Sequence, residues 1–309
     1  MSVYVEQNSS YRNYDTNKSW VILSSIESSI KEKIEKKGTP LKEWNVTIYR
    51  GILTGYNKAF IIDSAKKDEL IAADPKSAEI IRPILRGRDI KRYRCNFAGS
   101  WLISTFPSKK YDIDDYPAIK SHLLSFGKER LEQTGKKYMI NGKEIKSRKK
   151  TNNKWFETQD SISYWDDFSK QKIVWGEISD KPKFAFDING EYTPEATAFL
   201  MVGSSLPFLY SFLNSNLSEY YFAQNGTTTG VGTVRWKKFK IEQIPVPKID
   251  NEKAIEFSNI VNELLYLGEL SNEFKEKVSQ LNTMIYQLFC FDNKEIAYIE
   301  SFCNNNKEY

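Results

Sequence analysis

Apolar residues recur at three- and four-residue steps over about 252–289, in the order Phe257, Val261, Leu264 and onward to Leu288. This spacing places them on one face of a helix, and Gly268 is a natural point of interruption. Asp292 and Glu295 follow with the spacing of a helix start. The last part of the chain is therefore predicted to be purely helical.

A second helical pattern lies near the N-terminus. Ser24 and Glu27 have the spacing of a capping box, and Ile30 and Ile34 then lie four residues apart before Gly38. These residues predict a short helix over about 25–37. Longer helical patterns are also expected over Tyr116–Gln133 and Pro207–Phe222.

The middle of the chain has a different pattern, with short runs rich in Ile, Val and aromatic residues. Such runs, bounded by turn residues, are typical of strands. They are Val46–Tyr49, Ala59–Ile62, Trp101–Ser104, Lys172–Trp175, Lys183–Phe186 and Ala198–Val202. The polar segment 134–154 is expected to be a loop. The prediction is an α+β protein with a mixed β-sheet and a helical C-terminal region.

Charge is distributed unevenly along the 309 residues, which carry a formal net charge of +5. Residues 251–309 carry a net charge of −5, so the first 250 residues carry +10. Segment 128–154 has ten Lys plus Arg against three Glu, and segment 82–94 has six basic residues against Asp89 alone. A basic body with an acidic end is expected of a module that binds a polyanion, although solvated Lys-rich surface explains any single run equally well.

Several classes of protein are disfavoured. No apolar run approaches the length of a membrane span, and three distant cysteines indicate reduced thiols, so a cytoplasmic protein is expected. The single histidine, His122, is expected to be structural, and no nucleophile elbow or phosphate-binding loop is present. Of the acid-x-Lys pairs, the one at Glu144 is expected in a polar loop and the one at Asp74 precedes a proline, which argues against a nuclease site.

With these classes disfavoured, a role in binding a ligand remains. Phosphates are contacted by Lys, Arg and backbone N–H groups, and base edges are read by Arg, Lys, Asn or Gln. Three segments supply such residues, with no catalytic or metal-ligating residue expected among them. The predicted DNA-binding residues are Arg86, Arg88, Lys91 and Arg92; Lys146, Arg148, Lys149, Lys150 and Asn152; and Asn225, Thr227, Thr228, Thr229, Arg235, Lys237 and Lys238. Trp236, beside the third group, is predicted to be a core anchor.

These motifs resemble a known family. Gly51-Ile-x-Thr-Gly-x-Asn-x-Ala-Phe60, Gly87-Arg-Asp-Ile-x-Arg-Tyr93, Arg235-Trp-Lys-Lys238 and Ile241-Glu-x-Ile-Pro-Val-Pro247 occur in this order. They are similar to the TaqI-like specificity domain, the C-terminal part of type IIG restriction-modification enzymes and related adenine-specific DNA methyltransferases. The likeness spans about residues 18–302. It implies a sequence-specific, double-stranded DNA recognition module that directs a methyltransferase or endonuclease to its site.

The same resemblance implies that DNA recognition and catalysis are carried out by separate domains. Family members carry an Asn-Pro-Pro-aromatic catalytic motif and a glycine-rich S-adenosylmethionine motif in a separate domain, and neither occurs in this sequence. The cofactors S-adenosylmethionine and Mg²⁺ are therefore expected only in missing catalytic domains, and a methyltransferase or nuclease domain or subunit is the expected partner. We expect residues 1–40 to be a linker and helix, 41–250 the recognition domain and 251–309 a helical region. The abrupt start favours a fragment over a separate subunit.

Two alternatives remain open. The basic surface could dock an acidic protein partner such as a DNA mimic. Otherwise, the chain could be part of an active adenine-specific DNA methyltransferase whose site is not recognised. Binding of S-adenosylmethionine would favour the second alternative, and failure to bind any duplex at low salt would favour the first.

Overall fold

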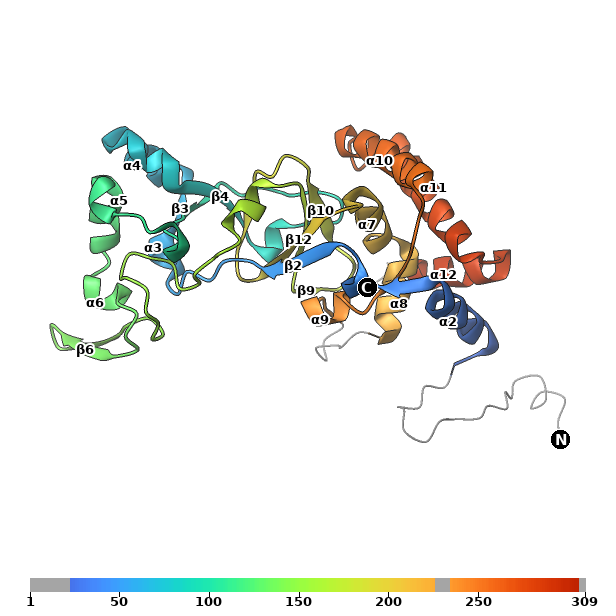
Figure 1. Ribbon diagram of the computed structural model, residues 1–309, viewed down its shortest axis with the longest axis horizontal. Helices are drawn as coiled ribbons and strands as arrows, with labels where there is room; N and C mark the ends of the chain where they lie inside the picture. Colours follow the sequence, from blue (N-terminus) through green and yellow to red (C-terminus); the bar gives the residue numbers. More distant parts are fainter. Residues whose placement is uncertain (1–22, 226–233, 306–309) are drawn as a thin grey trace. The chain divides into compact units, whose positions relative to one another are not determined.

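The computed structural model describes residues 23–225 and 234–305, which form two compact units. The first unit combines the described residues of Met1–Trp44, Ser215–Asn225 and Glu242–Tyr309. The second combines those of Asn45–Asn214 and Gly226–Ile241. Segments far apart in sequence thus meet within each unit (Figure 1).

The first unit is mainly helical. Its helices are α2 (Ser25–Lys37), α8 (Asn216–Asn225), α10 (Asn251–Tyr266), α11 (Asn272–Phe289) and α12 (Asn293–Asn305), with one 3₁₀ turn, η1 (Leu41–Glu43). Strands β1 (Gly38–Pro40) and β14 (Pro245–Pro247) pair antiparallel. Helices α2, α8, α11 and α12 pack together, with fully buried Ile30 and Phe289 among the core residues. The predicted capping box at Ser24 and Glu27 is confirmed.

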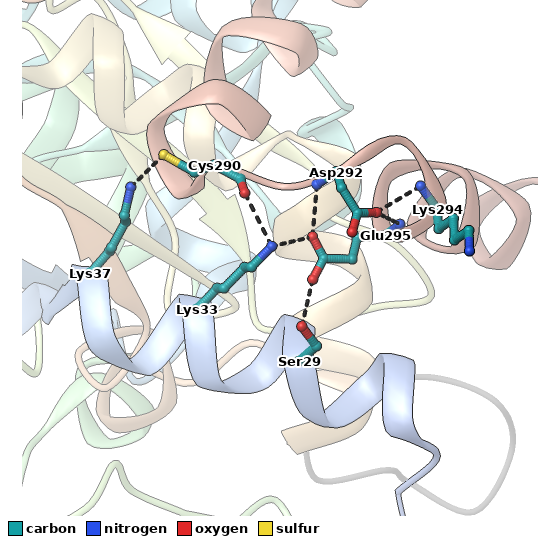
Figure 2. Close-up of polar contacts among 7 residues, drawn as sticks. All are labelled: Ser29, Lys33, Lys37, Cys290, Asp292, Lys294 and Glu295. Atoms are coloured by element: carbon teal, nitrogen blue, oxygen red, sulfur yellow. Dashed lines mark hydrogen bonds and ion pairs between the residues drawn. The ribbon is translucent and has the colours of Figure 1, made fainter.

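A buried carboxylate fixes α2 to the start of α12 (Figure 2). Glu295 Oε2 lies 2.6 Å from Lys33 Nζ, and Ser29 donates to Oε1 at 2.7 Å. Lys33 also donates to the carbonyl of Cys290 at the end of α11. Burial alone would raise the pKa of Glu295, but hydrogen bonds from Lys33 and Ser29 outweigh it and lower the pKa below its usual value. The Glu295 carboxylate therefore joins α2 to α12, and Lys33 joins α2 to the end of α11 as well.

The second unit contains two four-stranded sheets. The first has the order β10-β8-β12-β2 and is antiparallel throughout. Its strands are β2 (Val46–Arg50), β8 (Lys172–Gly176), β10 (Phe184–Asp187) and β12 (Ala198–Gly203). Strand β8 is buried at all five positions, because it lies between two strands and is covered on both faces. This sheet contains four of the predicted strands.

The second sheet has the order β11-β4-β5-β3, in which β11 and β4 are parallel. Its strands are β3 (Ile61–Asp63), β4 (Ile81–Leu85), β5 (Ser100–Ile103) and β11 (Thr193–Pro194). Helices α3 (Asn57–Phe60), α4 (Ser64–Ala73), α5 (Pro117–Leu124) and α6 (Lys128–Leu131) lie beside it, with 3₁₀ turns η2 (Pro75–Ile80), η4 (Pro107–Lys109) and η5 (Ile113–Asp115). One hydrophobic core runs through both sheets and includes Phe60, Leu102 and Leu200.

Smaller elements complete the second unit. They are η3 (Gly87–Asp89), η6 (Trp165–Ser169), the paired strands β6 (Lys137–Ile140) and β7 (Lys143–Lys146), the paired strands β9 (Ile178–Ser179) and β13 (Val234–Arg235), and helices α7 (Leu206–Leu213) and α9 (Lys238–Ile241). The half-buried His122 contacts the carbonyl of Ala59 through Nε2, and burial lowers its pKa. This is the structural role predicted for it.

The α+β fold class is confirmed, and the differences from the predicted elements have local causes. The predicted helix over Tyr116–Gln133 ends at Leu124, because Gly127 has a φ of +85° and starts a separate turn. The helix expected over Pro207–Phe222 is two helices joined at Asn214 and Ser215. Segment 134–154, expected to be a loop, contains the hairpin β6–β7.

Candidate nucleic-acid interface

An open hollow of about 720 Å³ lies in the second unit. Four separate parts of the sequence line it, and its basic side chains exceed its acidic ones. The lining residues are Arg50, Asn57, Arg86, Gly87, Arg88, Ile90, Lys91, Gly176, Glu177, Ile178, Ser179, Lys183, Glu195 and Thr197.

Two glycines let the backbone of η3 approach the end of β8. A Cβ on Gly87 would lie 2.8 Å from the carbonyl oxygen of Thr197 and 3.3 Å from Cα of Gly176. A Cβ on Gly176 would lie 3.0 Å from the carbonyl oxygen of Gly87. Because both contacts are with backbone, Gly87 has no room for a larger residue unless the backbone shifts, and a Cβ at Gly176 would be a tight fit. The close contact places Arg86 and Arg88 at the edge of the hollow.

Asp89 holds the turn that carries these arginines. Its side chain accepts from the backbone N–H of Arg86 at 2.9 Å, and its own N–H donates to the Arg86 carbonyl at 2.9 Å. The Arg88 side chain is 72% exposed, and its Nε lies 3.9 Å from Asp89. So distant a contact with an exposed arginine leaves the guanidinium available for an anionic ligand.

A chain of hydrogen bonds connects this turn to the glycine-rich stretch 51–60. Thr54 donates to Asn57, and Asn57 donates to Glu195 at 3.1 Å. The other oxygen of Glu195 accepts from Thr197 Oγ1 at 2.6 Å, and the Gly87 N–H donates to this hydroxyl at 3.0 Å. The stretch 51–60 therefore contributes Asn57 to the lining of the hollow and connects it to the arginine-bearing turn.

Gly51 is required in the same support. A Cβ at this position would lie 2.2 Å from the carbonyl oxygen of Glu195 and 2.5 Å from that of Pro194. These two residues belong to the segment that also carries Thr197. The glycine thus permits a backbone contact that holds segment 194–197, which lines the hollow through Glu195 and Thr197.

Glu177 lies between two arginines at the other side of the hollow. Its carboxylate oxygens are 3.6 Å from Arg50 Nη2 and 3.4 Å from Arg235 Nη1. Nearby, Lys183 Nζ pairs with Asp180 at 2.7 Å, and the hydrogen bond from Lys183 lowers the pKa of Asp180. The hollow therefore contains arranged pairs of opposite charge as well as unpaired basic groups.

A second basic surface is the two-stranded ribbon formed by β6 and β7. Asn141 and Gly142 form its tight turn with φ values of +49° and +74°, both in the left-handed region that a type I′ turn requires. Lys137 lies directly opposite Lys146, and Met139 is 71% exposed. The exposed lysines of the ribbon and its flanks are Lys136, Lys137, Lys143, Lys146, Lys149 and Lys150.

Arg148 anchors the base of this ribbon. Its guanidinium donates to four backbone carbonyls, those of Leu131, Thr54, Glu157 and Trp155, at 2.7–2.8 Å. Only 4% of the residue is exposed, and burial lowers its pKa to about 10. Because the four carbonyls belong to three different segments, one side chain holds the ribbon to the body of the unit.

Comparison with known proteins decides the family. The model of the TaqI-like C-terminal specificity domain matches residues 82–246, which is more than half of the chain and includes Arg86, Glu177 and Arg235. The chain belongs to the family of TaqI-like C-terminal specificity domains. A search of curated protein sequences gives no significant match.

Solved structures add two larger enzymes. The structure of the type IIL restriction-modification enzyme MmeI in complex with DNA matches this specificity domain with a TM-score of 0.58 and 13% sequence identity, covering 87% of this chain and 36% of that chain. The type IIG restriction endonuclease BpuSI matches with a TM-score of 0.47 and 15% identity, covering 84% of this chain and 32% of that chain. The likeness to MmeI shows a shared fold. The specificity domain described here spans about a third of the length of either enzyme.

The structure brings together three of the four predicted basic residues of the first group. Arg86, Arg88 and Lys91 line the hollow. Arg92 does not: its guanidinium donates to the carbonyl of Asn214 and lies 5.5 Å from the centre of the Tyr93 ring. The side chain of Arg92 is half-buried and makes these contacts within the protein, so it does not join the other three at the hollow, and its contact with DNA stays a prediction.

The second group also contains both exposed residues and one residue that is bonded inside the protein. Lys146, Lys149, Lys150 and Asn152 are exposed on and beside the ribbon. Arg148 is buried with all of its bonds inside the protein, so its expected DNA contact is replaced by a structural role. The sequence could not distinguish Arg148 from its neighbours because basic side chains surround it on both sides.

The third group lies only partly within the described residues. Arg235 is at the hollow through Glu177, and Trp236 is 3% exposed, as predicted for a core anchor. Lys237 is half-buried, and Lys238 donates to the carbonyl of Ile48. Asn225 ends α8 in the first unit, and its side chain is not described. The expected contacts of Thr227, Thr228 and Thr229 lie outside the described residues.

Sequence reasoning missed Arg50, Glu177 and Lys183, which belong to the hollow but lie far from its arginine cluster in sequence. It also missed the ribbon, although Asn141-Gly142 between two short apolar runs is a strong hairpin signal.

Across residues 23–225 and 234–305, no group of three or more His, Cys, Asp or Glu residues could hold a metal ion. Nor is any helix in this part of the chain long and apolar enough to cross a membrane.

Proposed function

We propose that this chain is the double-stranded DNA target-recognition module of a restriction-modification system and directs a methyltransferase or endonuclease to its site. One observation carries the proposal: a member of the specificity-domain family has a hollow in which Arg86, Arg88 and Lys91 meet Arg50 and Lys183. The likeness of fold to MmeI, which was solved in complex with DNA, supports it.

The two basic surfaces suit different parts of DNA. Exposed lysines on the ribbon are flexible point charges, and such groups contact phosphates without reading sequence. Arginines in the hollow are held by a rigid backbone, and held arginines can donate to base edges in a defined direction. In this proposal the ribbon supplies affinity, and the hollow supplies most of the choice of sequence.

Catalysis belongs elsewhere in the proposal. Base flipping and methyl transfer would be carried out by a partner domain or subunit that binds S-adenosylmethionine and Mg²⁺, and this chain would bind neither. We further propose that residues 41–250 contain the recognition surface, that residues 251–309 contact the partner, and that the complex is cytoplasmic. A titration with S-adenosylmethionine tests the division, because heat of binding to this chain alone would contradict it.

Duplex binding should depend steeply on salt. If about six phosphates are neutralised, the slope of log K against log salt concentration is expected to be about −5. Fluorescence anisotropy of a labelled 30-base-pair duplex, measured between 50 and 300 mM salt, checks this. Failure to bind any duplex at the lowest salt would overturn the proposed function and favour an acidic protein partner.

Removing ribbon charge should weaken binding to all sequences alike. For the combined variant Lys146→Ala, Lys149→Ala and Lys150→Ala, we expect the salt slope to become shallower by about 2.7 and affinity at 100 mM salt to fall about 10- to 100-fold. The matched control replaces exposed Lys36, Lys42 and Lys275 in the first unit. Equal losses in the two variants would show that overall charge, and not the ribbon, determines affinity.

A further inference from the structure

Glu177 is an acidic residue in a hollow that otherwise suits a polyanion. Its side chain is 18% exposed, and its nearest charged neighbours are Arg50 and Arg235, which come from β2 and β13. A carboxylate in this position lowers the positive potential felt by a phosphate, and therefore reduces general affinity for nucleic acid. The contribution of Glu177 to the hollow must therefore be to orient neighbouring side chains and not to attract DNA.

The backbone of Glu177 is fixed on both sides. Its N–H donates to the carbonyl of Thr197 at 2.9 Å, and its carbonyl accepts from the N–H of Trp236 at 2.8 Å. The buried Trp236 ring donates to the carbonyl of Ser179 at 3.3 Å, and the Trp236 carbonyl accepts from the Trp175 ring at 2.8 Å. The side chains of Glu177 and Arg235 therefore extend from backbone that these hydrogen bonds hold in place.

Arg50 has a second restraint. Its Nε donates to the carbonyl of Ala196 at 2.8 Å, while Nη2 faces Glu177 and 62% of the side chain remains exposed. A guanidinium carries five N–H donors, so these two restraints leave donors for a ligand. An arginine that is already oriented loses less conformational entropy when it donates to a base edge than a freely moving one.

We propose that Glu177 is a positioning residue for DNA recognition: it holds Arg50 and Arg235 as an oriented pair and so increases discrimination between sequences while it reduces affinity for DNA in general. This inference rests on the proposed function of the hollow. It adds Glu177 and Arg50 to the residues that determine specificity. It also assigns opposite effects to one carboxylate, which a purely structural role would not produce.

The test uses Glu177→Gln in the full chain, because glutamine keeps the size of the side chain and removes its charge. Binding is measured to one duplex of arbitrary sequence, and wild type and variant each select from a pool of duplexes with a randomised 14-base-pair centre. We expect the variant to bind the arbitrary duplex about 2- to 5-fold more tightly at 50 mM salt. We also expect its preference for the sequence that wild type selects to fall about tenfold.

Glu69→Gln on α4 is the matched control, since it removes the same charge from an exposed pair with Lys66 that does not line the hollow. A further variant, Arg50→Gln with Arg235→Gln, should lose the same preference, and adding Glu177→Gln to it should change the preference little. An unchanged selected sequence and preference in Glu177→Gln would overturn the role of Glu177 and leave the proposed function standing. Equal weakening of all duplexes would also overturn it, while absence of duplex binding by wild type would overturn both proposals.

Discussion

Replacement of Arg148 by methionine is expected to lower the free energy of unfolding of the second unit by about 3–5 kcal/mol. Methionine fills much of the same space but donates no hydrogen bond. The carbonyls of Leu131, Thr54 and Trp155 would lose the donor they now share, while that of Glu157 would keep the side-chain amide of Gln133. Each buried carbonyl left unpaired costs about 1–3 kcal/mol. The total is smaller than three full penalties because water can reach some of these groups when the ribbon loosens.

Urea unfolding followed by tryptophan fluorescence measures this effect, and Trp155 lies next to the affected carbonyls. Lys149→Met is the control, because it removes a neighbouring exposed charge and should change the free energy of unfolding by less than about 0.5 kcal/mol. Arg148→Lys should recover less than half of the loss, since an ammonium group cannot span carbonyls on several segments. Equal stability of the two methionine variants would show that Arg148 is not the anchor of the ribbon.

This residue also shows where sequence analysis reaches its limit. Four of the five residues from Lys146 to Lys150 are basic, and their spacing gives no sign that one side chain points inward. Burial of Arg148 depends on carbonyls between residues 54 and 157, and such long-range geometry is set only by the assembled fold. Strands β2, β8, β10 and β12 could be predicted from the sequence, because each is a short run rich in Ile, Val and aromatic residues, and that pattern is local to the run.

The residues of the hollow could likewise be predicted only in part from the sequence. Arg86, Arg88 and Lys91 are close in sequence and on one turn, so their cluster could be recognised without a structure. Arg50, Glu177 and Arg235 are contributed by three distant segments, and neither their spacing nor their types relate them. The family predicted from the motifs is confirmed by the match over residues 82–246, which does not include the stretch 51–60. The structural reason for Gly51, its close contact with Glu195, is visible only after folding.

The ion pair between Lys172 and Asp187 gives the second large expected effect. These residues are direct partners where β8 and β10 pair, and their charged groups lie 2.5 Å apart with 0% and 2% of the side chains exposed. Burial lowers the pKa of Lys172, while the attraction of Asp187 opposes that shift. Lys172 Nζ also donates to the carbonyl of Phe168, and Asp187 accepts from the N–H groups of Glu191 and Tyr192.

Lys172→Met should therefore destabilise the second unit by about 3–5 kcal/mol, because it leaves a buried carboxylate without its counter-ion. Asp187→Asn alone should also destabilise it, since the lysine then lacks a partner. The double variant should be more stable than the sum of the two single losses predicts, with a coupling of about 1–3 kcal/mol. Urea unfolding of the four proteins at pH 7 gives this coupling directly. Additive losses would mean that each side chain acts through its separate backbone hydrogen bonds, so that the pairing of β8 with β10 would not depend on the ion pair.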